Sequence, residues 1–93
     1  MSKRSIVEND VPGICFLCGR VSTDVHHIFE GSKRKRCDEL CITVNLCRDC
    51  HGLVHSSKGN EVRKQLHELG QRTYEKKIGS REEFIKDFIL SYL

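Results

Sequence analysis

The sequence contains no tryptophan, and only 6% of its 93 residues are aromatic. A chain of this length buries roughly 60–65% of the surface that it would expose when unfolded, so an apolar core alone would be marginally stable. Domains of this size commonly add a disulfide, a metal ion or an oligomeric contact. We therefore expect one domain that depends on such a cross-link.

Long apolar runs are also absent from the sequence. No stretch approaches 18 apolar residues, which excludes a membrane span. The first eight residues are polar and charged, unlike a secretory signal, so we expect a reducing cytoplasmic location. In that compartment, cysteines at short spacing are more often metal ligands than disulfides. The formal charge of +3 permits an anionic partner without demanding one.

Composition divides the chain into three predicted segments. Residues 1–13 form a polar, flexible lead-in that ends at a Pro-Gly pair. Residues 14–58 contain all six cysteines and four of the five histidines, together with β-prone pieces at 25–29 and 42–46. The intervening segment 34–40 fits either a short helix or an ordered loop.

Residues 59–93 predict two helices that form a hairpin against the cysteine-rich half. Asn60 is a candidate N-cap for the first helix, in which Gly70 costs about 1 kcal/mol relative to alanine. Ser80 followed by Glu83 is a capping box that begins the second helix. His67 lies in the polar pattern of the first helix, so we expect it at the surface.

Two Cys-x-x-Cys pairs are the strongest motif in the sequence. They are formed by Cys15 with Cys18 and by Cys47 with Cys50. Two such turns can converge on one tetrahedral ion, and four thiolates favour a closed, structural zinc site. The Cys-x-x-x-Cys pair, Cys37 and Cys41, does not have this spacing, and we interpret these residues as small buried thiols. A thiol redox pair is the lowest-ranked alternative.

The histidines suggest a second metal site. His51 and His55 are four residues apart, a spacing that places two imidazoles on one face of a helix. His26 can supply a third ligand and leave a coordination position for water or a phosphate oxygen. His27 is suited to be a general base near neutral pH, although a regular strand would point it away from His26. The amide of Asn45 can hold the loop after the first strand and thereby orient His27.

Taken together, the cysteine pairs, His26-His27-Ile28, Asn45-Leu46 and His51-x3-His55 resemble the HNH endonuclease family, in its zinc-binding branch found in phage and mobile elements. The resemblance covers about residues 14–57. It implies an α+β fold with a small ββα-metal (His-Me finger) core, and a metal-dependent enzyme that hydrolyses DNA phosphodiester bonds.

By position, the resemblance implies that His26 and His51 bind the catalytic ion, that His27 is the general base and that Asn45 orients the loop. His55 would be an additional ligand, as in the branch similar to colicin nuclease domains. The catalytic ion would be Mg²⁺, Mn²⁺, Ni²⁺ or Zn²⁺, beside the structural Zn²⁺ of the cysteines. The spacing on both sides of Asn45 departs from the colicin-like pattern.

The basic segment, Lys33, Arg34, Lys35 and Arg36, would then lie in the loop between the two strands, beside the cleft. There it could bind DNA phosphates without sequence preference, although a solvated run of charges is the simpler interpretation. The alternative to an enzyme is a non-catalytic zinc-binding module for nucleic acid or protein. Both a monomer and a homodimer are compatible with the sequence.

Overall fold

The structure is a computed structural model that describes residues 5–93. It confirms the α+β class, with a two-stranded antiparallel sheet and helices around it. The elements in chain order are β1 (Asp24–His27), η1 (Gly31–Lys33), α1 (Arg34–Leu40), β2 (Thr43–Leu46), α2 (Arg48–His55), η2 (Ser57–Gly59), α3 (Asn60–Lys77) and α4 (Arg81–Phe88). Among residues 5–93, no helix is both long and apolar enough to cross a membrane.

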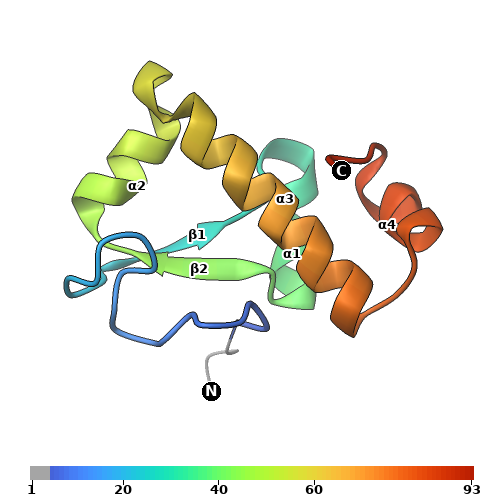
Figure 1. Ribbon diagram of the computed structural model, residues 1–93, viewed down its shortest axis with the longest axis horizontal. Helices are drawn as coiled ribbons and strands as arrows, with labels where there is room; N and C mark the ends of the chain where they lie inside the picture. Colours follow the sequence, from blue (N-terminus) through green and yellow to red (C-terminus); the bar gives the residue numbers. More distant parts are fainter. Residues whose placement is uncertain (1–4) are drawn as a thin grey trace.

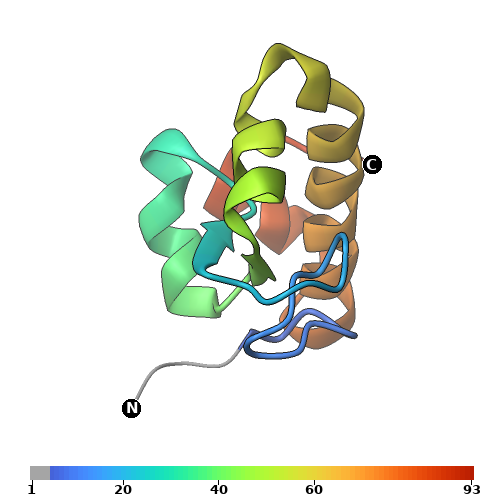
Figure 2. The same cartoon turned by 90° about the vertical axis from the view of Figure 1, so that its left-hand side faces the viewer.

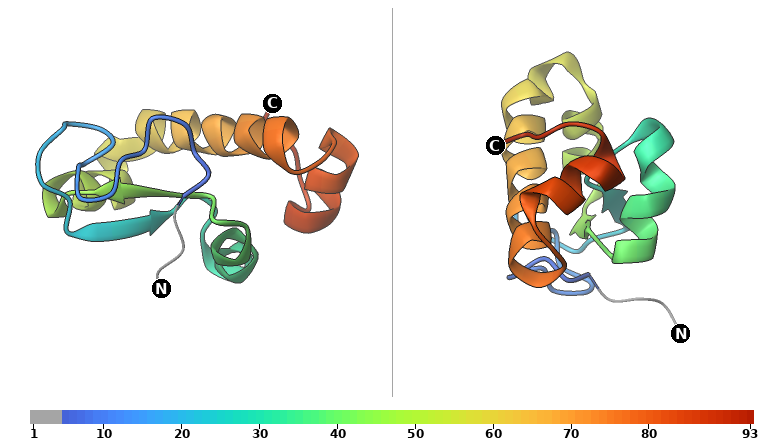
Figure 3. Two further views of the ribbon diagram at one scale, coloured as in Figure 1. Left: turned by 90° about the horizontal axis from the view of Figure 1, so that it is seen from below. Right: turned by 90° about the vertical axis from the view of Figure 1, so that its right-hand side faces the viewer.

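The two strands lie in the middle of the molecule, with helices on both sides. Figure 2 shows α1 and α3 on opposite sides of the strands, and the left view of Figure 3 agrees. In Figure 1, α2 leaves one end of the sheet while α4 lies beyond the other end. The sequence was compatible with either a helix or a loop at residues 34–40, and the structure shows that this segment is the helix α1.

The register of the sheet fixes the positions of the paired histidines. His26 lies opposite Val44, and His27 lies opposite Thr43. Side chains alternate between the two faces of a strand, so neighbouring histidines diverge. His26 is buried, with 3% of its surface exposed, and its face carries α2, whereas His27 extends toward α1.

An aromatic cluster joins the segment that follows β1 to α4 and to the chain after α4. The ring of Phe29 lies 5.4 Å from that of Phe84, 4.7 Å from that of Phe88 and 5.2 Å from that of Tyr92. His67 also packs here, stacked on Phe29 at 5.8 Å. His67 is half-buried, because the ring of Tyr92 also lies 4.7 Å from it, so the expectation of a surface residue holds only in part.

The predicted starts of the two C-terminal helices are largely confirmed. Ser80 caps α4, and the reciprocal bonds with Glu83 complete the capping box. Helix α3 begins at Asn60 itself, so its N-cap is Gly59 rather than Asn60. A Cβ at Gly59 would lie 2.1 Å from the carbonyl oxygen of Leu53, so only glycine fits this junction.

The N-terminal segment contacts the core in the part that the structure describes. Val7 is buried, and the backbone N–H of Ile6 donates to the carbonyl of Cys41 at 3.0 Å. Residues 1–4 of the predicted lead-in lie outside the described residues.

At Gly70, α3 packs closely against the two residues that follow β1. A Cβ at this position would lie 2.8 Å from both Ile28 Cγ2 and Phe29 Cζ. Real Cβ atoms do not approach carbon this closely, so the glycine permits the helix to pack directly on the residues that follow His27.

We predict that Gly70→Ala lowers the free energy of unfolding by about 1 kcal/mol, because overpacking costs about 1–3 kcal/mol and the helix gains about 1 kcal/mol. Gly52 in α2 has open space around a Cβ, so Gly52→Ala is the matched control and stabilises the protein. Urea denaturation of both variants measures the difference. Equal stabilisation by the two substitutions would contradict the close approach.

Candidate metal centres

Four thiols gather at the end of the sheet where α2 begins. The sulfur atoms of Cys15, Cys18, Cys47 and Cys50, hereafter the four-cysteine cluster, all lie within 4.8 Å of one another. Cys18 Sγ and Cys47 Sγ are 3.6 Å apart. Sulfur ligands about 2.3 Å from one tetrahedral ion would be about 3.8 Å apart, so the geometry fits a single metal ion.

Local backbone structure positions these thiols. Gly19 has a φ of +81° and closes a turn in which its N–H donates to the carbonyl of Cys15 at 3.0 Å. A left-handed conformation favours glycine, which explains why Gly19 follows the Cys15–Cys18 pair. Cys47 is the N-cap of α2, and its sulfur accepts from the N–H of Cys50 at 3.4 Å.

The electrostatics of the four-cysteine cluster favour a cation. Burial raises the pKa of the Cys15 thiol, but hydrogen bonds with the backbone of Cys47, Cys18 and Leu17 outweigh it and lower the pKa to about 6. The pKa of Cys50 is raised, first by burial and then by the neighbouring thiols. Four thiolates in one place repel one another, and a divalent cation removes that repulsion.

Cys37 and Cys41 lie apart from this cluster. Cys37 is fully buried, its Sγ donates to the carbonyl of Ile42 at 2.8 Å, and burial raises its pKa to about 11. Cys41 is half-buried and ends α1 with a φ of 60°. Within the described part of the chain, neither belongs to a group of potential metal ligands.

Three imidazoles form a second group of potential ligands. One ring nitrogen each of His26, His51 and His55, hereafter the histidine cluster, lies within 4.8 Å of the other two. His26 comes from β1, while His51 and His55 lie one turn apart on α2. Their ring centroids are 4.8 to 5.4 Å apart. The arrangement can hold one metal ion through neutral imidazole nitrogens.

The histidine cluster opens into a cavity of about 220 Å³, which is also lined by Val25, His27, Glu30, Gly31 and Arg34. His26 lies at its base, and His55 lies at its rim with 48% of its side chain exposed. Burial, followed by the electrostatic influence of the neighbouring imidazoles of His51 and His55, lowers the pKa of His26 to about 4. His26 is therefore neutral at pH 7, the form that binds a metal ion.

Two carboxylates that the sequence analysis missed lie beside the histidine cluster. Asp24 Oδ2 is 2.9 Å from His51 Nδ1, a hydrogen bond that directs the other nitrogen of His51 into the cavity. Glu30 Oε1 is 3.7 Å from both His26 Nε2 and His55 Nδ1. Spacing contained a signal for Asp24, which shares a strand face with His26, but none for Glu30, which lies beyond the end of β1.

His27 has a carboxylate partner of its own. Its Nε2 lies 3.0 Å from Oδ1 of Asp38, which is on α1. A carboxylate accepts, so Nε2 carries the hydrogen and Nδ1 keeps its lone pair. His27 lines the cavity of the histidine cluster together with its neighbour His26, although its Nε2 is directed to α1.

The side chain of Asn45 points to a different part of the molecule from the one expected. Its Nδ2 donates to Asp10 Oδ2 at 2.7 Å, and its backbone N–H donates to Asp10 Oδ1 at 2.8 Å. Its carbonyl accepts from the N–H of Phe16 at 2.7 Å. Among residues 5–93, the contacts of Asn45 thus connect β2 to the segment of the first cysteine pair instead of holding the loop beside His27.

The four residues of the basic segment separate into two pairs. Arg34 and Lys35 line a second cavity of about 480 Å³, next to the first, which His27 and Asp38 also line. Lys33 Nζ instead lies 3.2 Å from the hydroxyl of Tyr92. Arg36 forms ion pairs with Glu39 at 3.1 Å and with Asp87 at 3.3 Å, so carboxylates engage its guanidinium.

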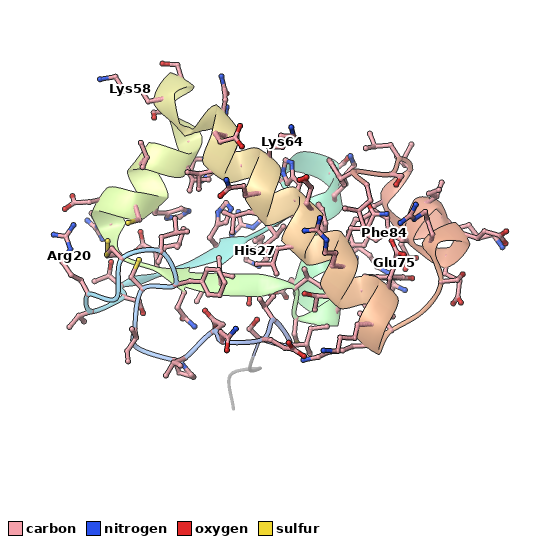
Figure 4. The ribbon with its side chains drawn as sticks, in the orientation of Figure 1. Arg20, His27, Lys58, Lys64, Glu75 and Phe84 are labelled. Carbon is pink, nitrogen blue, oxygen red and sulfur yellow. The ribbon has the colours of Figure 1, made fainter. Side chains whose placement is uncertain are left out.

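A second basic feature flanks the four-cysteine cluster. Arg20 lies 3.7 Å from Asp49, and Figure 4 shows it extending outward near the end of the sheet where α2 begins. A hydrogen bond with the Cys18 thiolate, together with its charge, raises the pKa of Arg20. Arg20 therefore offsets part of the negative charge of the cluster.

Searches against protein-family models, curated proteins and solved structures each found no match to this chain.

We predict that Cys47→Ser removes a tightly bound metal ion, which the parent protein carries, and lowers the melting temperature by at least about 15 °C. Loss of a structural metal costs more than about 4 kcal/mol, and each kcal/mol shifts the melting temperature of such a domain by about 4–8 °C. Elemental analysis and calorimetry measure both effects. Cys37→Ser is the control and retains the metal. Equal metal content in the two variants would exclude the cluster as a metal site.

Proposed function

We propose that this protein is a metal-dependent DNA endonuclease with an HNH-like site. The observation that carries the proposal is the histidine cluster itself. Residues 26, 51 and 55, from a strand and a helix, place three ring nitrogens within 4.8 Å of one another at an open cavity. A closed structural site would not need such an opening, whereas a catalytic ion must be accessible to its substrate.

The order and packing of the elements support a ββα-metal core made of β1, β2 and α2. The two strands pair antiparallel, and α2 contacts both of them. In this core, the four-cysteine cluster would bind structural zinc and fix the start of α2. The next turn of the same helix then presents His51 and His55 to β1.

The donor set of three imidazoles suits Ni²⁺ and Zn²⁺ better than Mg²⁺, which prefers oxygen ligands and would take more of them from water. His26, His51 and His55 would hold the ion, with Asp24 fixing the orientation of His51. When bound, an ion such as Mg²⁺, Mn²⁺, Ni²⁺ or Zn²⁺ supplies positive charge that neutralises the charge developing on the phosphate and on the leaving oxygen.

His27 is the proposed general base. Its Nδ1 accepts a proton from the attacking water, while Nε2–H continues to donate to Asp38. The carboxylate holds the ring in this tautomer and stabilises the imidazolium that forms. The orienting task that the sequence analysis gave to Asn45 is thus performed by Asp38 in this mechanism.

The substrate backbone would run along the two neighbouring cavities. Both are lined by His27, Gly31 and Arg34, and Lys35 extends the positive charge along the second. Phosphates bind such cations without regard to base sequence. We assign phosphate contacts to Arg34 and Lys35, and we assign Lys33 and Arg36 to the attachment of the C-terminal segment.

We predict that the protein nicks or cleaves supercoiled plasmid in the presence of a divalent ion and that His27→Ala slows cleavage by about 10²–10⁴-fold, the contribution of a general base. Asp38→Asn gives a smaller loss, because the ring remains but its orientation is weakened. Gel analysis with Mg²⁺, Mn²⁺, Ni²⁺ and Zn²⁺ measures the rates. DNA binding without cleavage in every ion would instead support the non-catalytic zinc-binding module.

We also predict that Arg34→Ala and Arg36→Ala have different effects. Arg34→Ala weakens DNA binding and reduces its dependence on salt by about one phosphate contact. Arg36→Ala leaves DNA affinity close to that of the parent but lowers stability, because Asp87 and Glu39 lose their partner. Fluorescence anisotropy at several salt concentrations measures the first effect and thermal unfolding the second. If Arg36→Ala weakened DNA binding and Arg34→Ala did not, the assignment of the phosphate contact to Arg34 would be excluded.

A further inference from the structure

The carboxylate of Glu30 lies at the histidine cluster without forming a hydrogen bond to it. Its Oε1 is 3.7 Å from His26 Nε2 and 3.7 Å from His55 Nδ1. Both separations are longer than a hydrogen bond between an imidazole and a carboxylate. Asp24 differs, because its 2.9 Å distance to His51 Nδ1 is that of a true hydrogen bond.

The Glu30 distances to His26 and His55 match those between ligands of one metal ion, although Glu30 lies outside the group whose ligand atoms are all within 4.8 Å of one another. Nitrogen and oxygen ligands about 2.0–2.2 Å from a tetrahedral ion lie about 3.4 Å from one another. Glu30 Oε1 is close to that separation from two members of the cluster at once. We propose that Glu30 is the fourth protein ligand of the ion that the histidine cluster binds when no nucleic acid is present. This inference rests on the proposed function, since it assumes the same metal site.

The position of Glu30 in the fold suits a ligand that can leave. It precedes the short helix η1, and its side chain makes no capping hydrogen bond there. It lines the cavity, yet 39% of its side chain is exposed, so rotation toward solvent meets little obstruction. The histidine ligands, in contrast, are fixed by β1 and by α2.

The consequence is competition between Glu30 and the substrate. Three histidines and one carboxylate complete a four-coordinate site, which leaves no position for another oxygen. A DNA phosphate is also an anionic oxygen ligand, so it would take the position that Glu30 vacates. Glu30 would then hold the ion when no DNA is bound and would select for ligands that outcompete a carboxylate.

The test uses Co²⁺ as a visible probe in protein whose four-cysteine cluster is already filled with zinc. Absorbance titrations compare the parent with Glu30→Gln, His55→Ala and the matched control Glu61→Gln, an exposed glutamate on α3. Loss of a residue that only supports a ligand costs about 10–100-fold in metal affinity, so Glu30→Gln should weaken Co²⁺ binding by at least about tenfold. The Co²⁺ bands should change in position and intensity, and inorganic phosphate should perturb them at lower concentration than in the parent. Glu61→Gln should behave as the parent does.

The outcomes separate the two proposals. If Glu30→Gln binds Co²⁺ as the parent does while His55→Ala loses it, Glu30 is not a ligand and the histidine site stands. Weaker binding with unchanged Co²⁺ bands also overturns the ligand role, because the coordination would be the same. If neither variant alters Co²⁺ binding, the metal site of the proposed function fails together with this inference.

Discussion

The placement of α2 against the two-stranded sheet is the constraint on which both candidate metal centres depend. Cys47 caps this helix, Cys50 lies in its first turn, and His51 and His55 follow within the same eight residues. A helix is a rigid unit, so fixing its first turn fixes the direction of the imidazoles one turn later. The four-cysteine cluster and the histidine cluster are therefore mechanically connected through one short helix. A metal ion bound by the cysteines would position the histidines before any second ion arrives.

The other potential ligands reach this helix through contacts between distant parts of the chain. His26 is carried by β1, whose register with β2 is fixed by backbone pairing from Asp24 to His27. The residues after β1 are held in turn by the C-terminal helices, because Phe29 packs among aromatic rings of α4 and the following segment. The C-terminal third, to which no role at the site was assigned from sequence, thus supports the strand that carries His26 of the histidine cluster and its neighbour His27.

Much of the candidate site could be predicted because its spacing is local. Two residues between cysteines form a tight turn, and three residues between His51 and His55 place both on one helix face. Alternation of strand residues likewise explains why His26 is buried while His27 faces α1. The starts of the two helices in the C-terminal third followed from capping residues, with an error of one residue where Gly59 packs closely on Leu53.

The sequence by itself determined the types of potential metal ligand, their grouping along the chain and the α+β class, since these follow from spacing and periodicity. Only the tertiary structure decided which carboxylate serves which histidine, that Asn45 pairs with Asp10, and that Arg36 is held by Asp87 while Arg34 faces the cavity. Each of those pairs joins residues brought together by the packing of α1, α4 and the N-terminal segment around the sheet. Such contacts depend on how the elements pack, which the spacing of residues along the chain does not specify. Neighbouring side chains of the same type, such as Arg34 and Arg36, therefore have different partners.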